Sequence, residues 1–144
     1  MCREFLAAVT EHPWEDRETV IQGSIAAWRA CFPHACCANI RESTWDGQAG
    51  ERTAPVMDAD FVHFEGLREL YMEGCKEVTD AAFVHLKGVK RLDISDCTQL
   101  TITDDSLKGI EWLGMEGHSK AQKAQARGHG FNVDFDSDDE EEEE

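Results

Sequence analysis

Four residues between positions 31 and 37 carry side chains that commonly bind metal ions. Thiolate sulfur and imidazole nitrogen are ligands that zinc accepts, and the chain offers both in Cys31, His34, Cys36 and Cys37. The spacing CxxHxCC differs from that of paired zinc knuckles, and the neighbouring Cys36 and Cys37 would face opposite sides of a strand. We therefore expect free, reduced thiols here, with no metal and no other cofactor.

The remaining cysteines and histidines do not form the sets that catalysis requires. A thiol enzyme needs a cysteine with a positioned base and an orienting partner, and no such set follows Cys97. Cys97 repeats Cys75 after 22 residues, and His85 repeats His63 at the same interval, so packing explains these residues better than chemistry. The sequence also lacks a phosphate-binding glycine loop, a GxSxG turn and an HExxH helix. We expect a protein that is not an enzyme.

The recurrence of these residues reflects a tandem repeat between Asp58 and His118. One copy reads DADFVHFEGLRELYMEGCKEV and the next TDAAFVHLKGVKRLDISDCTQL, followed by a less regular TDDSLKGIEWLGMEGH. Matching residues in the first two copies lie 22 positions apart: Asp58/Asp80, Phe61/Phe83, Gly66/Gly88, Leu70/Leu92 and Cys75/Cys97. In the third copy the interval is 21, at Gly109, Ile110, Leu113 and Met115. Such a period lies in the range of leucine-rich repeats.

The apolar residues of the repeat follow the pattern LxxLxIxxC. The pattern is filled by Leu67, Leu70, Met72 and Cys75, then by Val89, Leu92, Ile94 and Cys97. With the connecting TDAAFVHLKG, these residues resemble the cysteine-containing leucine-rich repeats that follow F-boxes in ubiquitin-ligase substrate receptors. The resemblance covers roughly half of the chain. It implies an α/β fold, a short leucine-rich-repeat solenoid with helical caps, and a role in binding proteins.

Each repeat is expected to pair a short helix with a strand. Thr79 or Asp80 can start the helix, and Gly88 permits the close turn into the strand RLDIS. Because side chains alternate along a strand, Leu92 and Ile94 point inward and the residues between them point outward.

Applied to all three copies, this alternation predicts a protein-binding face, which we call the recognition face. It consists of Glu69, Tyr71, Glu73, Arg91, Asp93, Ser95, Trp112 and Glu116. Tyr, Arg and Trp are residue types that anchor protein interfaces. The alternative for Trp112 is that the C-terminal segment covers it.

Residues 1–57 are expected to form an N-terminal helical cap with an irregular first repeat and a loop. We expect a helix at about Arg3 to Thr10, and another from Glu15 or Asp16 to Pro33. The second helix would bury one stripe made of Val20, Ile21, Ser24, Ile25 and Trp28. Its AAWRACFP stretch also resembles the end of an F-box, but a plain capping helix is the favoured interpretation.

The first repeat and the loop follow this cap. In HACCANIR, a strand is expected with Cys36, Ala38 and Ile40 alternating, and a loop should follow from Glu42 to Val56.

Residues 58–133 should contain the repeats and a C-terminal cap. Ser119 can cap a helix over about Lys120 to Arg127, after which Phe131 and Val133 would pack on the last repeat. The run 134–144, DFDSDDEEEEE, is expected to be a disordered acidic tail with a possible phosphorylation site at Ser137.

Net charge restricts the classes of partner. Among 144 residues, 14 Lys and Arg oppose 30 Asp and Glu, for a formal charge of -16. This charge disfavours nucleic acid and anionic membrane and favours basic proteins. The sequence has no apolar run of the ~20 residues that span a membrane and no secretion-signal pattern, so an intracellular protein, cytoplasmic or nuclear, is expected.

The lead hypothesis is a noncatalytic adaptor or substrate-recognition subunit of a ubiquitin ligase. Two alternatives remain. One is an acidic-tailed binder of basic proteins such as histones, similar in layout to acidic leucine-rich nuclear proteins. The other is a degenerate repeat fragment.

Overall fold

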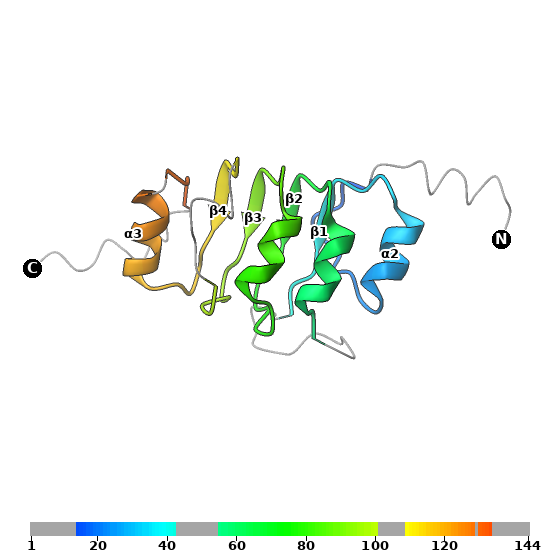
Figure 1. Cartoon of the computed structure of the whole chain (residues 1–144), viewed down its shortest axis with the longest axis horizontal. Coiled ribbons are helices and arrows are strands. Elements are labelled where there is room, and N and C mark those ends of the chain that lie inside the picture. Colours follow the sequence, from blue (N-terminus) through cyan, green and yellow to red (C-terminus); the bar gives the residue numbers. More distant parts are fainter. Residues whose placement is uncertain (1–13, 43–54, 101–108, 129, 134–144) are drawn as a thin grey trace, which may run out of the picture.

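A computed structural model describes residues 14–42, 55–100, 109–128 and 130–133, and within them the chain is a mixed α/β protein (Figure 1). Four parallel strands form one sheet in the order β1-β2-β3-β4 in this part of the chain. Their bounds are β1 Cys37–Asn39, β2 Glu69–Tyr71, β3 Arg91–Asp93 and β4 Trp112–Gly114. The mixed α/β class expected from the sequence is confirmed.

Helical segments connect the strands and close the ends of the sheet. They are α2 Ile25–Cys31, the 3-10 helices η1 Asp58–Phe64 and η2 Asp80–His85, and α3 Lys120–Gly128. The segments α2, η1 and η2 contact one another in sequence order, and Figure 1 places α2 and α3 at opposite ends of the sheet. Among the described residues, no helix has the length and apolar character to cross a membrane.

The repeat spacing sets the register of the sheet. Leu70 pairs with Leu92, and Leu92 pairs with Leu113, so the 22- and 21-residue intervals bring equivalent residues side by side. All three leucine side chains have 0% exposure. The inward direction predicted for the leucine positions is therefore confirmed, and they form the centre of one apolar core.

Local polar contacts explain where the short helices begin. Thr79 caps η2 by accepting a hydrogen bond from the N–H of Ala81, as the sequence predicts for this position. The Thr79 hydroxyl and N–H both donate to the Asp58 carboxylate, at 2.5 and 2.7 Å, so the start of η2 is joined to the start of η1. With seven and six residues, η1 and η2 are longer than most 3-10 helices.

A glycine with a positive φ angle precedes each of the strands β2, β3 and β4. Gly66, Gly88 and Gly109 have φ angles of 88°, 90° and 91°. A side chain is strained in this left-handed region, so the turn predicted at Gly88 recurs in all three copies.

A side-chain hydrogen bond joins each repeat to the preceding one. The Cys75 thiol donates to the carbonyl of Ile40, and the Cys97 thiol donates to that of Met72. In the third copy His118 replaces cysteine, and its Nε2 donates to the Ile94 carbonyl at 2.9 Å. The replacement therefore preserves the contact.

The helix predicted from Glu15 or Asp16 is wrong in its first half. Ile25 is the first helical residue, and Ser24 caps the helix by accepting from the Ala27 N–H. Asp16 instead closes a turn, because its carboxylate accepts from the N–H groups of Glu18 and Thr19. Gly23, at φ 75°, separates this turn from the helix. Of the predicted buried stripe, Ser24 is exposed and Val20 is partly buried, whereas the other three members are buried.

Residues 14–21, which we call the N-terminal segment, instead run beside β1. The N–H of Ile21 donates to the carbonyl of Asn39, and the N–H of Cys36 donates to that of Trp14. This segment also buries the residues expected to point outward: Cys37 has 2% exposure and Asn39 has 4%. The alternation predicted for this strand holds for Ala38 and Ile40 but not for Cys36, which is partly exposed.

The helix predicted over about Lys120 to Arg127 is confirmed as α3, Lys120–Gly128. The Ser119 hydroxyl accepts from the N–H of Gln122 at the start of α3. Val133 then forms a parallel bridge with Leu113, and Phe131 packs against the core. Several expectations lie outside the described residues: the helix at Arg3–Thr10, most of the Glu42–Val56 loop, the helix of the third copy, and the 134–144 tail with Ser137.

Substituting Leu92→Ala should lower the free energy of unfolding by about 2–5 kcal/mol, because it opens a cavity at the centre of the core. Urea denaturation followed by circular dichroism measures this change. The matched control is Val84→Ala on η2, where 59% exposure predicts a change within about 0.5 kcal/mol. Equal losses in the two variants would contradict the proposed core.

His118 should make stability depend on pH. Burial lowers the pKa of His118, so the folded chain keeps this ring neutral, whereas the unfolded chain titrates near the ordinary value of about 6.5. As the pH falls below about 6.5, the unfolded state gains a proton that the folded state does not, and stability declines until the folded pKa is passed.

We expect His118→Gln to flatten the fall in unfolding free energy between about pH 7 and 5, measured by urea titration at each pH. His34→Gln, which changes an exposed histidine, is the control and should leave the slope as it is. A His118→Gln slope identical to that of the unmodified chain would argue against this assignment.

Candidate functional site

Most residues of the recognition face lie in two rows across the sheet. Glu69 pairs with Arg91 and Arg91 with Trp112, whereas Tyr71 pairs with Asp93 and Asp93 with Gly114. These residues are partly exposed, except that Gly114 is buried. The structure therefore brings together on neighbouring strands the side chains that the sequence grouped.

Ser95 corrects the prediction for this face. It was expected to point outward, but its exposure is only 5%. Its hydroxyl accepts a hydrogen bond from the N–H of Glu116, and its carbonyl accepts from the N–H of Gly74. Ser95 therefore joins adjacent turns and is not available to a partner.

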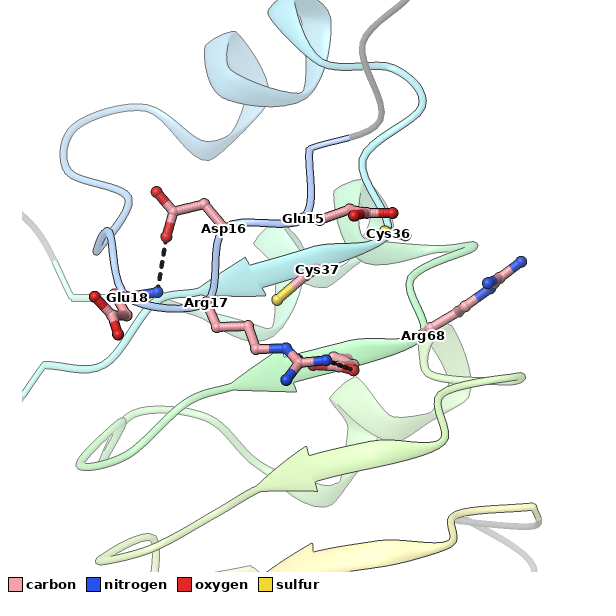
Figure 2. A pocket seen from close by; sticks show the side chains of 8 residues that line it. Glu15, Asp16, Arg17, Glu18, Cys36, Cys37 and Arg68 are labelled. Carbon is pink, nitrogen blue, oxygen red and sulfur yellow. Dashed lines mark hydrogen bonds and ion pairs between the residues drawn. The ribbon is translucent and has the colours of Figure 1, made fainter.

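An ion pair holds the N-terminal segment over the sheet. Arg17 Nε lies 2.7 Å from one Glu69 oxygen, and Arg17 Nη2 donates to the other at 2.7 Å. Figure 2 shows the Arg17 side chain extending from the N-terminal segment across the front of the strands. The Glu69 charge raises the pKa of Arg17, and the Tyr71 hydroxyl donates to Glu69 at 3.1 Å. Burial, followed by the Glu69 charge, raises the pKa of Tyr71 to about 12.

This part of the face is therefore compensated in charge and fixed in position. Sequence reasoning missed Arg17, because 52 residues separate it from Glu69 and no local pattern joins them.

Arg91 and Trp112 form a stacked pair on neighbouring strands. The guanidinium carbon lies 4.6 Å from the centre of the indole ring, within the range of a cation–π contact. Gly114 makes room beside it: a Cβ there would lie 2.7 Å from Asp93 Oδ1 and 2.8 Å from the Trp112 ring. A glycine at this position lets the indole and the Asp93 carboxylate share one part of the face, which the strand alternation alone did not predict.

Four carboxylates lie in or just after the row that Tyr71 and Asp93 form across the strands, and we call them the acidic group. They are Glu73, Asp93, Asp96 and Glu116. Burial raises the pKa of Glu73, and the charges of Asp93, Asp96 and Glu116 raise it further, whereas Arg41 opposes them. Within the described residues, none of the four belongs to an ion pair.

A surface pocket adjoins the acidic group. Its lining combines the front of β1 to β3 with the N-terminal segment and consists of Arg17, Glu18, Asn39, Arg41, Tyr71, Glu73 and Asp93. The pocket therefore joins an aromatic side chain to two members of the acidic group.

The cysteine-rich stretch of residues 31–37 contains free cysteines that differ in exposure. The five cysteines in the described ranges are unbridged, and no cluster of three or more potential metal ligands occurs there. Burial raises the pKa of Cys37 to about 12 and that of Cys97 to about 11, which disfavours the thiolate at neutral pH. Cys37 lies beneath the N-terminal segment, next to the Arg17 side chain (Figure 2).

The residues that resemble the end of an F-box hold the N-terminal helix in place. Trp28 has 8% exposure and packs against Trp14 and Phe64. Arg29 donates to the carbonyls of Ala35 and Glu65, at 3.1 and 2.7 Å. These contacts join α2 to η1 and to the residues just before β1.

The two repeat histidines lie on the helical side. His85 Nδ1 lies 2.8 Å from a Glu65 oxygen, so His85 joins two successive repeats. His63 is partly buried on η1.

Comparison with known proteins returns no matching family model, no matching curated protein and no matching solved structure.

Alkylation of the native protein by iodoacetamide should modify Cys31 well before Cys37, Cys75 or Cys97, because Cys31 is exposed and the other three are buried. Peptide mass spectrometry after timed quenching at pH 8 measures the rate at each cysteine. The same reaction in urea is the control and should equalise the rates. Rapid labelling of native Cys37 would contradict its burial and reopen the question of a reactive thiol.

Proposed function

We propose that the chain is a short leucine-rich-repeat solenoid with helical caps, and that it binds another protein through its recognition face. The observation that carries this proposal is the placement of Tyr71, Arg91 and Trp112, partly exposed, on three adjacent strands. Side chains of these types dominate the binding energy of many protein interfaces.

The solenoid part of the proposal is supported by contacts that recur at the repeat interval. Leu70, Leu92 and Leu113 lie side by side, and the same glycine turn precedes β2, β3 and β4. A thiol or imidazole joins each of these three repeats to the one before it. Repeats of this kind bury their apolar faces only by stacking, and the terminal ones need caps. The N-terminal segment with α2, and α3 with Val133, occupy the two ends in that way.

The binding part is supported by the fixed geometry of the face. Arg91 is stacked on Trp112, and Tyr71 is tied to Glu69, so these side chains have already lost much of their freedom before a partner arrives. Binding to side chains that are already ordered costs less conformational entropy. We expect the interaction to be noncatalytic docking, with aromatic area supplied by Tyr71 and Trp112.

The proposed cellular role is that of an adaptor or substrate-recognition subunit, as the resemblance to the repeat half of F-box receptors implies. Membership of a ubiquitin ligase would require recruitment through residues 1–57. A pull-down of the full chain with the F-box-binding adaptor protein tests this directly. Recovery of the adaptor would support membership, and its absence would leave a binding module outside that pathway.

A second candidate is an acidic-tailed binder of basic proteins such as histones, favoured by the formal charge of -16. Here the contacts would come from the run 134–144 and would weaken steeply with salt. Deleting the tail and titrating salt separates the two candidates: the tail-driven function loses binding, whereas binding through the recognition face persists. The proposed location is intracellular, cytoplasmic or nuclear.

Substituting Trp112→Ala should weaken partner binding by more than about 1 kcal/mol, because it removes the aromatic surface against which Arg91 is held. Peptides selected from a random library displayed against the full chain serve as the ligands, and calorimetry measures their affinities.

The control for this test is Val84→Ala, which removes an exposed apolar side chain from η2 instead of the sheet. It should leave affinity within about twofold of the unmodified chain. Denaturation midpoints confirm that both variants fold. Selected peptides that bind the Trp112→Ala variant as tightly as the unmodified chain would place the interaction elsewhere.

A further inference from the structure

We propose that the N-terminal segment is an autoinhibitory contact, which covers the β1 end of the recognition face until a partner displaces it. In the free chain this segment lies over the front of β1, and its Arg17 holds the Glu69 carboxylate of β2 (Figure 2). The inference rests on the proposed function and concerns its regulation. It also adds β1 to the surface that a partner uses.

The two rows of the recognition face continue onto β1. Cys37 pairs with Glu69 in one row, and Asn39 pairs with Tyr71 in the other. Paired residues of parallel strands project from the same side of the sheet, so Cys37 and Asn39 belong to the same front surface. Their exposures are only 2% and 4%, because the N-terminal segment covers them. Moving this segment aside would lengthen the face by one strand.

The N-terminal segment follows a longer path than the strand beside it. The carbonyl of Trp14 accepts from the N–H of Cys36, and the N–H of Ile21 donates to the carbonyl of Asn39. The segment therefore uses more residues than β1 does to cover the same length of sheet. The additional residues, 15–19, are all exposed. The middle of the segment thus has the length to move while both of its ends stay attached.

Apolar packing anchors the two ends of the segment. The Trp14 ring centre lies 4.4 Å from that of Phe32 and 6.4 Å from that of Trp28. Ile21 has 5% exposure and belongs to the apolar core. Removing side chains of this size from water is strongly favourable, so the ends are expected to remain in place.

Polar contacts at the surface hold the middle of the segment. Arg17 Nε and Nη2 each lie 2.7 Å from an oxygen of Glu69, and the Arg17 carbonyl accepts from the Asn39 side chain at 2.8 Å. The Arg17 side chain has 55% exposure, and exposed ion pairs add little to stability. Glu69 also keeps the Tyr71 hydroxyl as a donor when Arg17 leaves. Opening the middle of the segment should therefore be inexpensive.

Hollows lie on both sides of Arg17. A cavity of about 600 Å³ lies between residues 15–18 and the strands (Figure 2), and the pocket beside Tyr71 measures about 560 Å³. Arg17 lines both of them. Apolar packing therefore does not fill the space beneath the segment, and displacement of Arg17 would join the two hollows into one groove along β1 and β2.

A partner that uses this groove competes with the chain's own arginine. It has to break the contacts of Arg17 with Glu69 and Asn39 before it can reach these side chains. Its apparent affinity is then reduced by the fraction of molecules in which the segment is open. The closed segment thereby selects for partners that bind the whole face.

Labelling of Cys37 measures whether the segment opens. Cys37 lies beneath the segment, whereas Cys75 and Cys97 lie in the core and report unfolding of the whole fold. The variant Arg17→Ala removes the ion pair. Its matched control is Arg68→Ala, because Arg68 is exposed and extends away from Arg17 (Figure 2). Timed alkylation of the full chain by iodoacetamide at pH 8, followed by peptide mass spectrometry, gives the rate at each cysteine.

We expect Arg17→Ala to raise the Cys37 rate at least about fivefold without changing the Cys75 and Cys97 rates, because only the segment opens. Arg68→Ala should leave all three rates within about twofold of those in the unmodified chain. An unchanged Cys37 rate in Arg17→Ala, or a rise shared by Cys75 and Cys97, would overturn the inference.

Peptide affinity measures whether opening favours a partner. Peptides selected from a random library against the Arg17→Ala variant are titrated by calorimetry into this variant, the unmodified chain and the Arg68→Ala variant. Adding Trp112→Ala to the first variant identifies the peptides that use the recognition face. These peptides should bind Arg17→Ala about threefold to tenfold more tightly than the other two proteins, because no contact has to be broken first.

The outcomes separate this inference from the proposed function. Peptides that depend on Trp112 but bind all three proteins equally would remove the autoinhibitory contact and leave the recognition face standing. If no selected peptide depends on Trp112, the recognition face itself is wrong and the inference fails with it.

Discussion

The structure depends on the parallel pairing of equivalent aliphatic residues, Leu70 with Leu92 and Leu92 with Leu113. Each strand has three residues, too few for backbone hydrogen bonds alone to fix its position. Burial of the leucines at 0% exposure specifies the register, because a slip by one residue would turn a leucine to the surface and a charged residue inward. The contact between Asp58 and Thr79 and the donors at Cys75, Cys97 and His118 then hold neighbouring repeats at that register.

The same register orders the outer surface. Because Leu92 points inward, Arg91 and Asp93 project from the opposite side, next to residues from β2 and β4. Residues of different charge that are more than 20 positions apart in the sequence, such as Glu69 and Arg91, thus become neighbours on adjacent strands. The compensated Glu69 lies at one side of the recognition face, and the acidic group lies at the other. The two sides of the proposed surface therefore differ in charge, which the net charge of the chain does not reveal.

The regular spacing of the repeats made them predictable from the sequence. Contacts between distant residues determine the remaining parts, and no local pattern reveals such contacts. The strand leucines, the turn at Gly88, the cap at Thr79 and the C-terminal helix follow from local patterns that one sequence displays. The N-terminal segment does not, because acidic residues near position 16 suit both a helix start and a side-chain turn, and contact with Asn39 favours the second. Likewise, the exposure expected for Ser95 assumed an uninterrupted strand, whereas the turn after β3 buries its hydroxyl against Glu116.

The outer strands of the sheet are both engaged by other parts of the chain. Along β1, the N–H of Ile21 donates to the carbonyl of Asn39, and the carbonyl of Trp14 accepts from the N–H of Cys36. On β4, the N–H of Leu113 donates to the carbonyl of Asn132. An open strand edge is a template on which further copies of a protein can polymerise. Covering these edges with segments that do not themselves continue the pattern discourages amyloid-like growth, so a chain this small can keep short, apolar parallel strands without joining its neighbours into fibres.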